Sequence, residues 1–286
     1  MRRLHVALTC AVLGTLFASG TTAKAGSVFL TGHDPDFHAS LGGNGVGAQH
    51  INQTAIGFIT DTKFNTFAAA GVKKFLFVES KIAVPSGHTD GENGIVASGY
   101  TLGTDFETHT ASDLTAEIDK LGTKYDAIVI GSDFGGLLTQ AELNILNNKS
   151  STIINFLNAG GGLYAMAESN SGAGLTPDGG QFKFLPFVVA SAQKDQSESG
   201  ITLTSFGTSL GLTTNDVNGN ASHNIFDSAP LGLSVVDKDA SGQILSIAGR
   251  PEKITAVPLP AAVWAALPTL VLIVAVRKLK AGSDPA

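Results

Sequence analysis

The sequence predicts an α/β fold, in which a mostly parallel sheet carries helices on both faces and so forms three layers. Two observations favour this class. Between residues 26 and 180, short apolar segments with the length of buried strands alternate four times with segments of helical periodicity. Glycine-rich turns separate these segments. The alternation is typical of βαβ units, whose right-handed crossovers place helices on both faces of a parallel sheet.

The first part of this domain is expected to hold three strands and one helix. The apolar runs SVFLT at 27–31 and KFLFVE at 74–79 predict two buried strands. Between them, residues 52–70 place their apolar side chains near one helical face. Residues 80–99 are expected to form a loop, and residues 99–106 a third strand.

The second part contains the best-marked helix, at 139–159. Thr139 and Glu142 have the spacing of a capping box, and a break is expected near 147–150. The other expected elements are a helix at 112–121 with Ser112 as its N-cap and strands at 126–130 and 163–167.

After residue 180 the helical patterns stop. Apolar runs at 182–190, 201–206, 231–236 and 243–247 predict short strands joined by Gly-, Asn- and Ser-rich loops. We therefore expect residues 26–180 to form the α/β domain and residues 181–250 to form a β-rich extension of it.

The N-terminus has the pattern of a secretory signal peptide at residues 1–25. A basic start and an apolar stretch precede Ala23 and Ala25, which fit an A-x-A cleavage site for signal peptidase. Cys10, the only cysteine, lies in this segment. The exported protein is therefore expected to contain no disulfide, no cysteine nucleophile and no cysteine metal ligand.

The C-terminus contains a second targeting pattern. A short motif within the linker 251–260 runs directly into an apolar stretch at 261–276, which is near the lower length limit for a transmembrane helix. A basic tail at 277–286 follows and predicts a cytoplasmic end. The motif residues are Val257, Pro258, Leu259, Pro260 and Ala261, and the basic residues are Arg277, Lys278 and Lys280. On topology alone, a plain C-terminal membrane anchor remains an alternative.

Residues 256–280 resemble the VPLPA variant of the PEP-CTERM sorting signal, the substrate tag of bacterial exosortases. Pro268 within the apolar stretch and the extra residues 281–286 depart from that pattern. The resemblance implies a membrane-anchored precursor in a Gram-negative bacterium, which an exosortase processes. The product is then expected at the cell surface or in extracellular polysaccharide.

Residues 126–167 resemble the core of class-I glutamine-amidotransferase-like domains, which have a flavodoxin-like sheet. The shared features are the strand and loop YDAIVIGSDFGG and the helix end LNAGGG before the next strand. Active members carry a cysteine on the turn after that strand, whereas residues 167–172 here read AESNSG. The resemblance therefore implies the fold without the amidotransferase chemistry, and a non-enzymatic surface or matrix protein is the leading expectation.

Composition excludes some partners. Removing residues 1–25 and 261–286 moves the formal charge from −6 to −11. Such an acidic protein is not expected to bind nucleic acid, which favours clustered Lys and Arg. The glycine-rich segments match neither a dinucleotide fingerprint nor a P-loop.

One loop contains candidate metal ligands. His33, Asp34, Asp36 and His38 follow the first expected strand, and ligands bind near the carboxyl ends of parallel strands. Two imidazoles and two carboxylates can hold zinc or manganese. A metal-assisted hydrolase acting on glycans or amides is therefore the alternative function, and no other cofactor is expected. The simpler interpretation is a polar loop whose side chains cap its own backbone.

Two further patterns leave alternatives open. Ser132 is expected at the same sheet edge but lies in no G-x-S-x-G motif, so serine hydrolysis is only weakly indicated. Residues 216–220 and 237–242 place oxygen side chains at alternate positions, which suits calcium loops and Asx-rich turns alike.

Overall fold

The computed structural model describes residues 24–80, 91–133, 138–168, 181–188, 190–193 and 199–254. The predicted sorting motif, transmembrane helix and basic tail lie outside these residues, as does the signal peptide up to Ala23. Within the described ranges, no helix is both long enough and apolar enough to span a bilayer.

The described strands form one mixed sheet. Its parallel half has the spatial order β3-β2-β4-β5-β1. The bounds of these strands are Val28–Thr31 for β1, Lys74–Val78 for β2, Phe106–His109 for β3, Tyr125–Ile130 for β4 and Gly162–Ala165 for β5. The α/β class and the parallel sheet expected from the sequence are therefore confirmed.

The antiparallel half continues from β1. β10 pairs with β1 so that Val28 faces Gly249 and Thr31 faces Ser246. β8 and then β6 extend the sheet from β10, while β9 pairs with both β10 and β7. These strands span Ala190–Gln193 (β6), Thr202–Leu203 (β7), Asn224–Phe226 (β8), Ser234–Lys238 (β9) and Ile244–Gly249 (β10). The β-rich region thus shares a sheet with the α/β region.

The parallel order is flavodoxin-like in space but is connected differently. A flavodoxin sheet has the order 2-1-3-4-5, in which the last strand occupies one edge of the parallel set. Here the first strand, β1, takes that place beside β5, and β2 to β5 supply the other four positions. The loop after β1 therefore lies next to the antiparallel strands.

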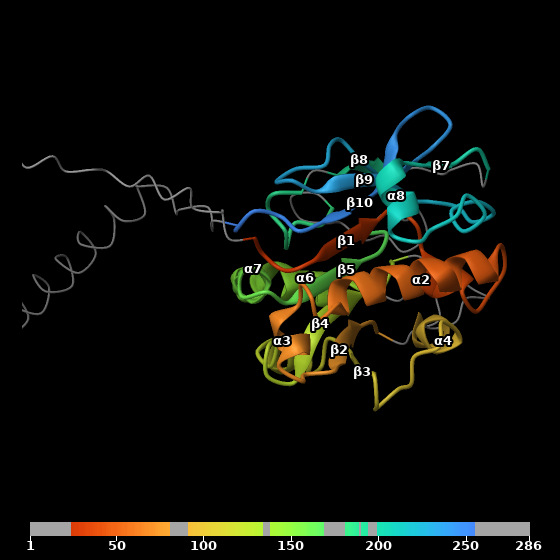
Figure 1. Cartoon of the computed structure of the whole chain (residues 1–286). Helices are drawn as coiled ribbons and strands as arrows, with labels where there is room; N and C mark the ends of the chain where they lie inside the picture. The colour runs from red at the N-terminus through yellow and green to blue at the C-terminus, as the bar shows by residue number, and fades with distance from the viewer. Residues whose placement is uncertain are drawn as a thin grey trace, which may run out of the picture.

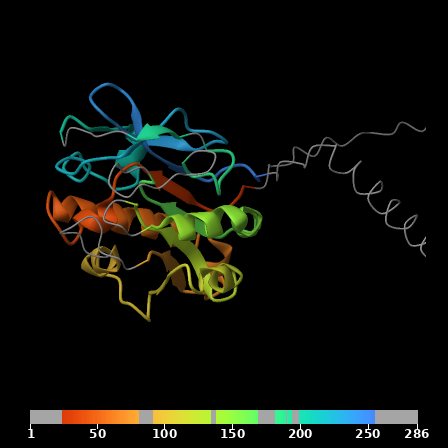
Figure 2. The ribbon, with the colours of Figure 1, turned by 180° about the vertical axis from the view of Figure 1, so that it is seen from behind.

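Helices cover both faces of the sheet. α2 (Gly45–Thr60) lies along one face with α4 and α8, as Figure 1 shows, and the view from behind shows α6 and α7 on the opposite face (Figure 2). The remaining bounds are Pro35–His38 (α1), Thr66–Ala69 (α3), Gly91–Ala97 (α4), Leu114–Ile118 (α5), Gln140–Asn148 (α6), Ser150–Asn158 (α7) and Ser205–Ser209 (α8).

Alternate residues of β1 pack into two separate hydrophobic cores, one on each face of the sheet. Val28 and Leu30 of β1 point into the core that contains the apolar side chains of α5, α6 and α7. Phe29, between them, points into the core that contains those of α2 and Ile95 of α4. Since side chains alternate across a sheet with period two, β1 needs apolar residues on both faces, and its sequence supplies them.

Side-chain caps explain where the helices begin and end. The capping box predicted at Thr139 and Glu142 is present. The predicted helix at 52–70 is instead two helices, because Asn65 caps α3 through Phe67 N and Ala68 N while its amide donates to Ile59 O. α2 begins earlier than predicted, at Asn44, whose side chain accepts from Gly47 N.

Five other sequence expectations were wrong. The strand expected at 201–206 ends at Leu203, and α8 begins at Ser205. A helix, α4, lies within the expected loop at 80–99, and the third strand runs over Phe106–His109 rather than 99–106. Asp113, not Ser112, is the N-cap of α5. Residues 181–187 form turns rather than a strand.

We expect Gly162→Ala to destabilise the fold by about 1–3 kcal/mol. A Cβ at this position in β5 would lie 2.2 Å from Ile59 O, so α2 would have to move off the sheet. Gly57→Ala is the matched control, because its Cβ would meet nothing within 4 Å and the exposed helical site should gain up to about 1 kcal/mol. Urea unfolding monitored by circular dichroism measures both. Equal stabilities for the two variants would contradict the packing described here.

Candidate functional site

Buried polar side chains gather at the carboxyl ends of β1, β4 and β5. Backbone hydrogen bonds join these strand ends, from Ala167 N to His33 O at 3.1 Å and from Asp133 N to Ala167 O at 2.8 Å. We call this group the carboxyl-edge cluster. Its members are His33, Asp34, Asp36, His38, Ser132, Asp133, Glu168, His223 and Asp237, and all but His38 are buried.

His33 is held by a residue from the far end of the chain. Its Nε2 lies 2.9 Å from Asp237 Oδ2, and both side chains are almost fully buried. Its backbone N–H donates to Thr31 Oγ1, which in turn bonds to Ser246 Oγ. The imidazole is thus fixed between the end of β1 and β9.

Asp34 lies between two imidazoles. Its Oδ1 is 3.4 Å from His38 Nε2, and its Oδ2 is 3.4 Å from His223 Nε2. His38 is one helical turn further along α1, whereas His223 is held by a hydrogen bond from its backbone N–H to Gly32 O at 2.6 Å. Neither Asp34 oxygen has a hydrogen-bond partner among the described residues, although the side chain is completely buried.

Asp36 faces β4. Ser132 donates to it twice, from its backbone N–H at 2.8 Å and from its hydroxyl at 2.7 Å. Burial raises the pKa of the Asp36 carboxyl to about 7, although the two bonds from Ser132 lower it. The Ser132 hydroxyl is therefore directed at a carboxylate, which is not the imidazole contact that a serine nucleophile requires.

Glu168 follows β5 at the same edge of the sheet. Its Oε2 accepts from Phe182 N at 2.6 Å, and its Oε1 has no hydrogen-bond partner within the described ranges. Burial raises the pKa of Glu168 to about 8. The charge of Asp133 raises it further, whereas the hydrogen bond from Phe182 N lowers it. A buried acid with such a pKa is protonated at neutral pH.

The four sequence-predicted metal ligands do not converge on one point. His33 pairs with Asp237, Asp34 with His38 and His223, and Asp36 with Ser132. They point to different partners because α1 turns successive side chains toward different strands. All four nevertheless belong to one cluster, and His223 and Asp237 complete it from positions that no local motif marks.

The alternating oxygen side chains at 216–220 serve the backbone. Asp216 Oδ2 accepts from Thr213 N at 2.6 Å, Asn218 bonds Ile201 through both its amide atoms, and Asn220 bonds Asn44 N and O. Residues 237–242 lie in the hairpin between β9 and β10, where Asp239 Oδ1 accepts from Gln243 N. Side-chain–backbone hydrogen bonds therefore occupy these oxygens, across the fold at Asn218 and Asn220 and within the hairpin at Asp239.

A second polar group lies on β3 and α5. Within the described residues, Glu107, His109 and Glu117 are the group of three whose ligand atoms lie within 4.8 Å of one another and could hold a metal ion. His109 Nδ1 bonds Asp113 Oδ2 at 2.8 Å, so its Nε2 faces the two glutamates. This group could not be found from the sequence pattern, because the third strand was expected to end before Glu107.

Lysines already neutralise this second group. Lys124 Nζ lies 2.5 Å from Glu107 Oε2 and 3.3 Å from Glu117 Oε2, and Lys74 and Lys120 pair with the other oxygens. The bond from Lys124 is the main reason that the pKa of Glu107 falls to about 2. Burial raises the pKa of Glu117, but bonds from Lys120, Tyr125 and Lys124 together lower it to about 2. A metal ion would have to displace these ammonium groups.

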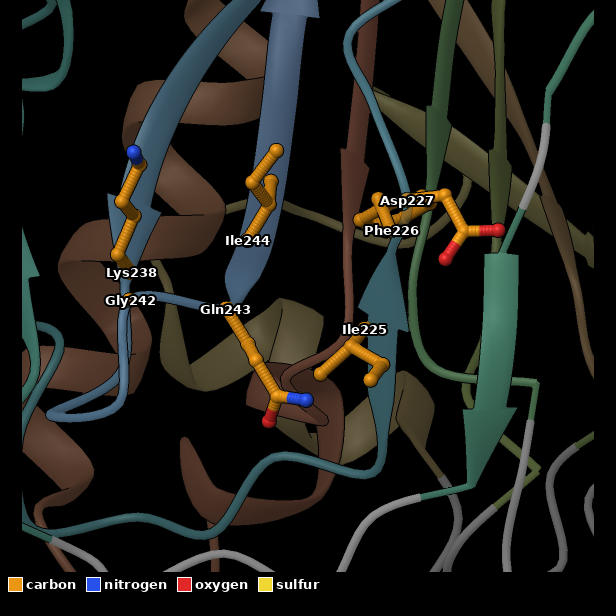
Figure 3. A pocket seen from close by; sticks show the side chains of 7 residues that line it. All are labelled: Ile225, Phe226, Asp227, Lys238, Gly242, Gln243 and Ile244. Carbon is orange, nitrogen blue, oxygen red and sulfur yellow. The ribbon is translucent and has the colours of Figure 1, made fainter.

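A cavity of about 280 Å³ opens beside the hairpin of β9 and β10. Figure 3 shows Lys238 and Asp227 on opposite sides of it. Its lining residues are Ile225, Phe226, Asp227, Lys238, Gly242, Gln243 and Ile244. This described lining includes no member of the carboxyl-edge cluster, so the cavity is separate from the candidate site.

Comparisons with protein-family models, with curated proteins and with solved structures give no match for this chain.

We expect the folded protein to lose stability as the pH rises because of Glu168, and we expect Glu168→Gln to abolish this loss. The pKa of Glu168 is about 8 in the folded protein and 4.5 ordinarily. At pH values between these two, the folded state keeps a proton on Glu168 that the unfolded state has released. Wild-type stability should therefore fall relative to the variant as pH rises from about 5 to 8, by at most about 1.4 kcal/mol per pH unit. Below about pH 4 the two should differ little.

Urea unfolding at several pH values between about 4 and 8 measures this difference. The exposed Glu252→Gln is the matched control for loss of one carboxylate at the surface. A stability difference between wild type and Glu168→Gln that stays constant with pH would contradict the burial of an ionisable Glu168.

Proposed function

We propose that this chain is an exported bacterial protein that an exosortase processes and delivers to the cell surface or the extracellular matrix. The observation that carries the proposal is the order of elements at the C-terminus: the VPLPA motif at 257–261, the apolar stretch at 261–276 and the basic residues that follow. The three parts occur together, in the order of a sorting signal. Extracellular polysaccharide is the partner that this destination suggests.

The start of the described chain bears on export. Ala25 is fully buried, its N–H donates to Pro251 O at 2.9 Å, and Gly26 N donates to Leu157 O at 2.7 Å. A peptidase cannot reach a buried peptide bond, so cleavage after Ala25 would have to precede closure of the fold. It would also remove the bond from Ala25 to Pro251 and leave Gly26 N as the terminal amine beside Leu157 O.

The site geometry supports a non-enzymatic role for the α/β domain. If the amidotransferase resemblance holds, the position of its cysteine corresponds to the turn at Glu168, whose side chain is buried and bonded to the backbone. Ser132 donates to Asp36 rather than to a histidine. We therefore propose that the domain binds or displays rather than hydrolyses, and that its buried acids serve ligand binding and structure.

The fate of the C-terminus tests the sorting proposal. We expect the product from the cell surface and medium to lack Arg277, Lys278 and Lys280, because processing removes the tail. Mass spectrometry of the mature C-terminus detects this loss. In a strain without the exosortase, the same measurement should find the intact tail in the membrane fraction. An intact tail in the surface product of the normal strain would instead establish a plain membrane anchor.

A metal-assisted hydrolase acting on glycans or amides is the second candidate. One observation favours this hydrolase: His33, Asp34 and Asp36 are buried at the strand ends. Side chains that faced solvent there would have argued against a metal site. Release of reducing sugar or ammonia from envelope polysaccharide and peptide by the purified protein would favour this candidate. A His33→Ala/His38→Ala double variant that releases the same amount would refute it.

A further inference from the structure

Asp34 is a buried carboxylate whose contacts with two imidazoles fall short of hydrogen bonds. It is the N-cap residue of α1, yet its side chain makes no capping hydrogen bond, although aspartate at this position ordinarily accepts one. Both of its oxygens are without a hydrogen-bond partner in the described part of the chain. Leaving a buried charge in this state costs several kcal/mol or more. A positive charge close to the carboxylate would remove this cost.

The two flanking imidazoles lie at a separation that suits a shared ion. Charge-assisted N–H···O bonds are about 2.7–2.9 Å long, and the two Asp34–imidazole contacts are longer, at 3.4 Å each. Two ligands that each lie about 2.1 Å from a tetrahedral ion are about 3.4 Å apart. The contacts are thus too long for strong ion pairs and have the spacing of neighbouring metal ligands.

We propose that Asp34 anchors a divalent cation of the zinc or manganese class, with His223 and His38 as its imidazole ligands. Imidazole and carboxylate donors together suit these metals. The site does not depend on the sorting proposal, and it differs from the four-residue loop site expected from the sequence. It joins α1 to the segment before β8, and so fastens the two halves of the sheet at its carboxyl edge.

The two imidazoles face opposite oxygens of Asp34, and the three groups do not already lie within 4.8 Å of one another. One of them has to move to share the ion. His38 is suited to this movement because it lies on a four-residue helix and its side chain is partly exposed. His223 is fixed through its backbone bond to Gly32. The ion therefore binds first to Asp34 and His223, and rotation of His38 completes the ligand set.

The rival site at Glu107, His109 and Glu117 provides a direct contrast. Its ligand atoms are closer together, but Lys74, Lys120 and Lys124 supply the positive charge that its carboxylates need. No lysine or arginine contact with Asp34 occurs among the described residues, where its ion-pair partners are histidines. The missing positive charge thus favours a metal ion at Asp34, whereas the site at Glu107, His109 and Glu117 is favoured only by the closeness of its ligand atoms.

Metal analysis of the full-length protein tests the proposal. The protein is purified in detergent, stripped with chelator, dialysed against Zn²⁺ or Mn²⁺ chloride, and measured by plasma mass spectrometry. We expect about one ion per wild-type chain. Asp34→Asn and His223→Gln should lower the affinity at least about tenfold. His38→Gln should lower it as well, and because His38 is partly exposed this variant should fold even where a change at Asp34 does not.

Two control variants separate this site from others. His109→Gln removes the rival site, and His50→Gln removes a histidine that pairs with Asp216 outside the cluster. Both should bind metal like the wild type. Absence of bound metal from the wild type, or loss of metal in His109→Gln with retention in His38→Gln, would overturn the proposal. Neither outcome would affect the mass of the mature C-terminus, so failure here is distinguishable from failure of the sorting proposal.

Discussion

β1 is buried along its whole length because it pairs with β5 on one side and with β10 on the other. It is the strand at which the parallel half of the sheet meets the antiparallel half. Its side chains contribute to both hydrophobic cores, so its register cannot slip by one residue without exposing Phe29 or exchanging it with Leu30. The position of every residue from His33 to His38 follows from this fixed register.

The meeting of the two halves creates the polar cluster. In a purely parallel sheet, the carboxyl edge would be lined by residues that follow parallel strands. Here β9 adds Asp237 against His33, and the segment before β8 adds His223 against Asp34. Both contacts join the antiparallel half to residues that directly follow β1, so they also hold the two halves of the sheet together. Ligand binding and cohesion of the sheet therefore depend on the same side chains.

The sequence predicted those features that depend on local pattern. The apolar runs that became β2 and β4 and the Thr139–Glu142 capping box were correctly placed. α4 was missed because GENGIVA contains two glycines. Gly94 is needed there, since a Cβ added at this position would lie 1.7 Å from Asp36 O. β3 was misplaced because FETH is a half-polar edge strand without an apolar run. Tertiary packing decides both elements.

The candidate site could be predicted only in part. His33, Asp34, Asp36 and His38 were identified because they are close in sequence and follow a strand. Their partners Asp237 and His223 are about two hundred residues away, and nothing in their own neighbourhood indicates a contact with α1. Sequence spacing also could not show that α1 would direct these side chains to different strands.

β1 places the buried carboxylate of Asp34, which contacts no lysine or arginine among the described residues, where the two halves of the sheet meet, and this carboxylate is the proposed cation site. Anomalous X-ray diffraction at the zinc edge, from crystals equilibrated with Zn²⁺, tests it most directly. The account predicts an anomalous peak within bonding distance of Asp34 and His223. A peak beside Glu107 and His109 with none at Asp34, or no peak at either position, would contradict it.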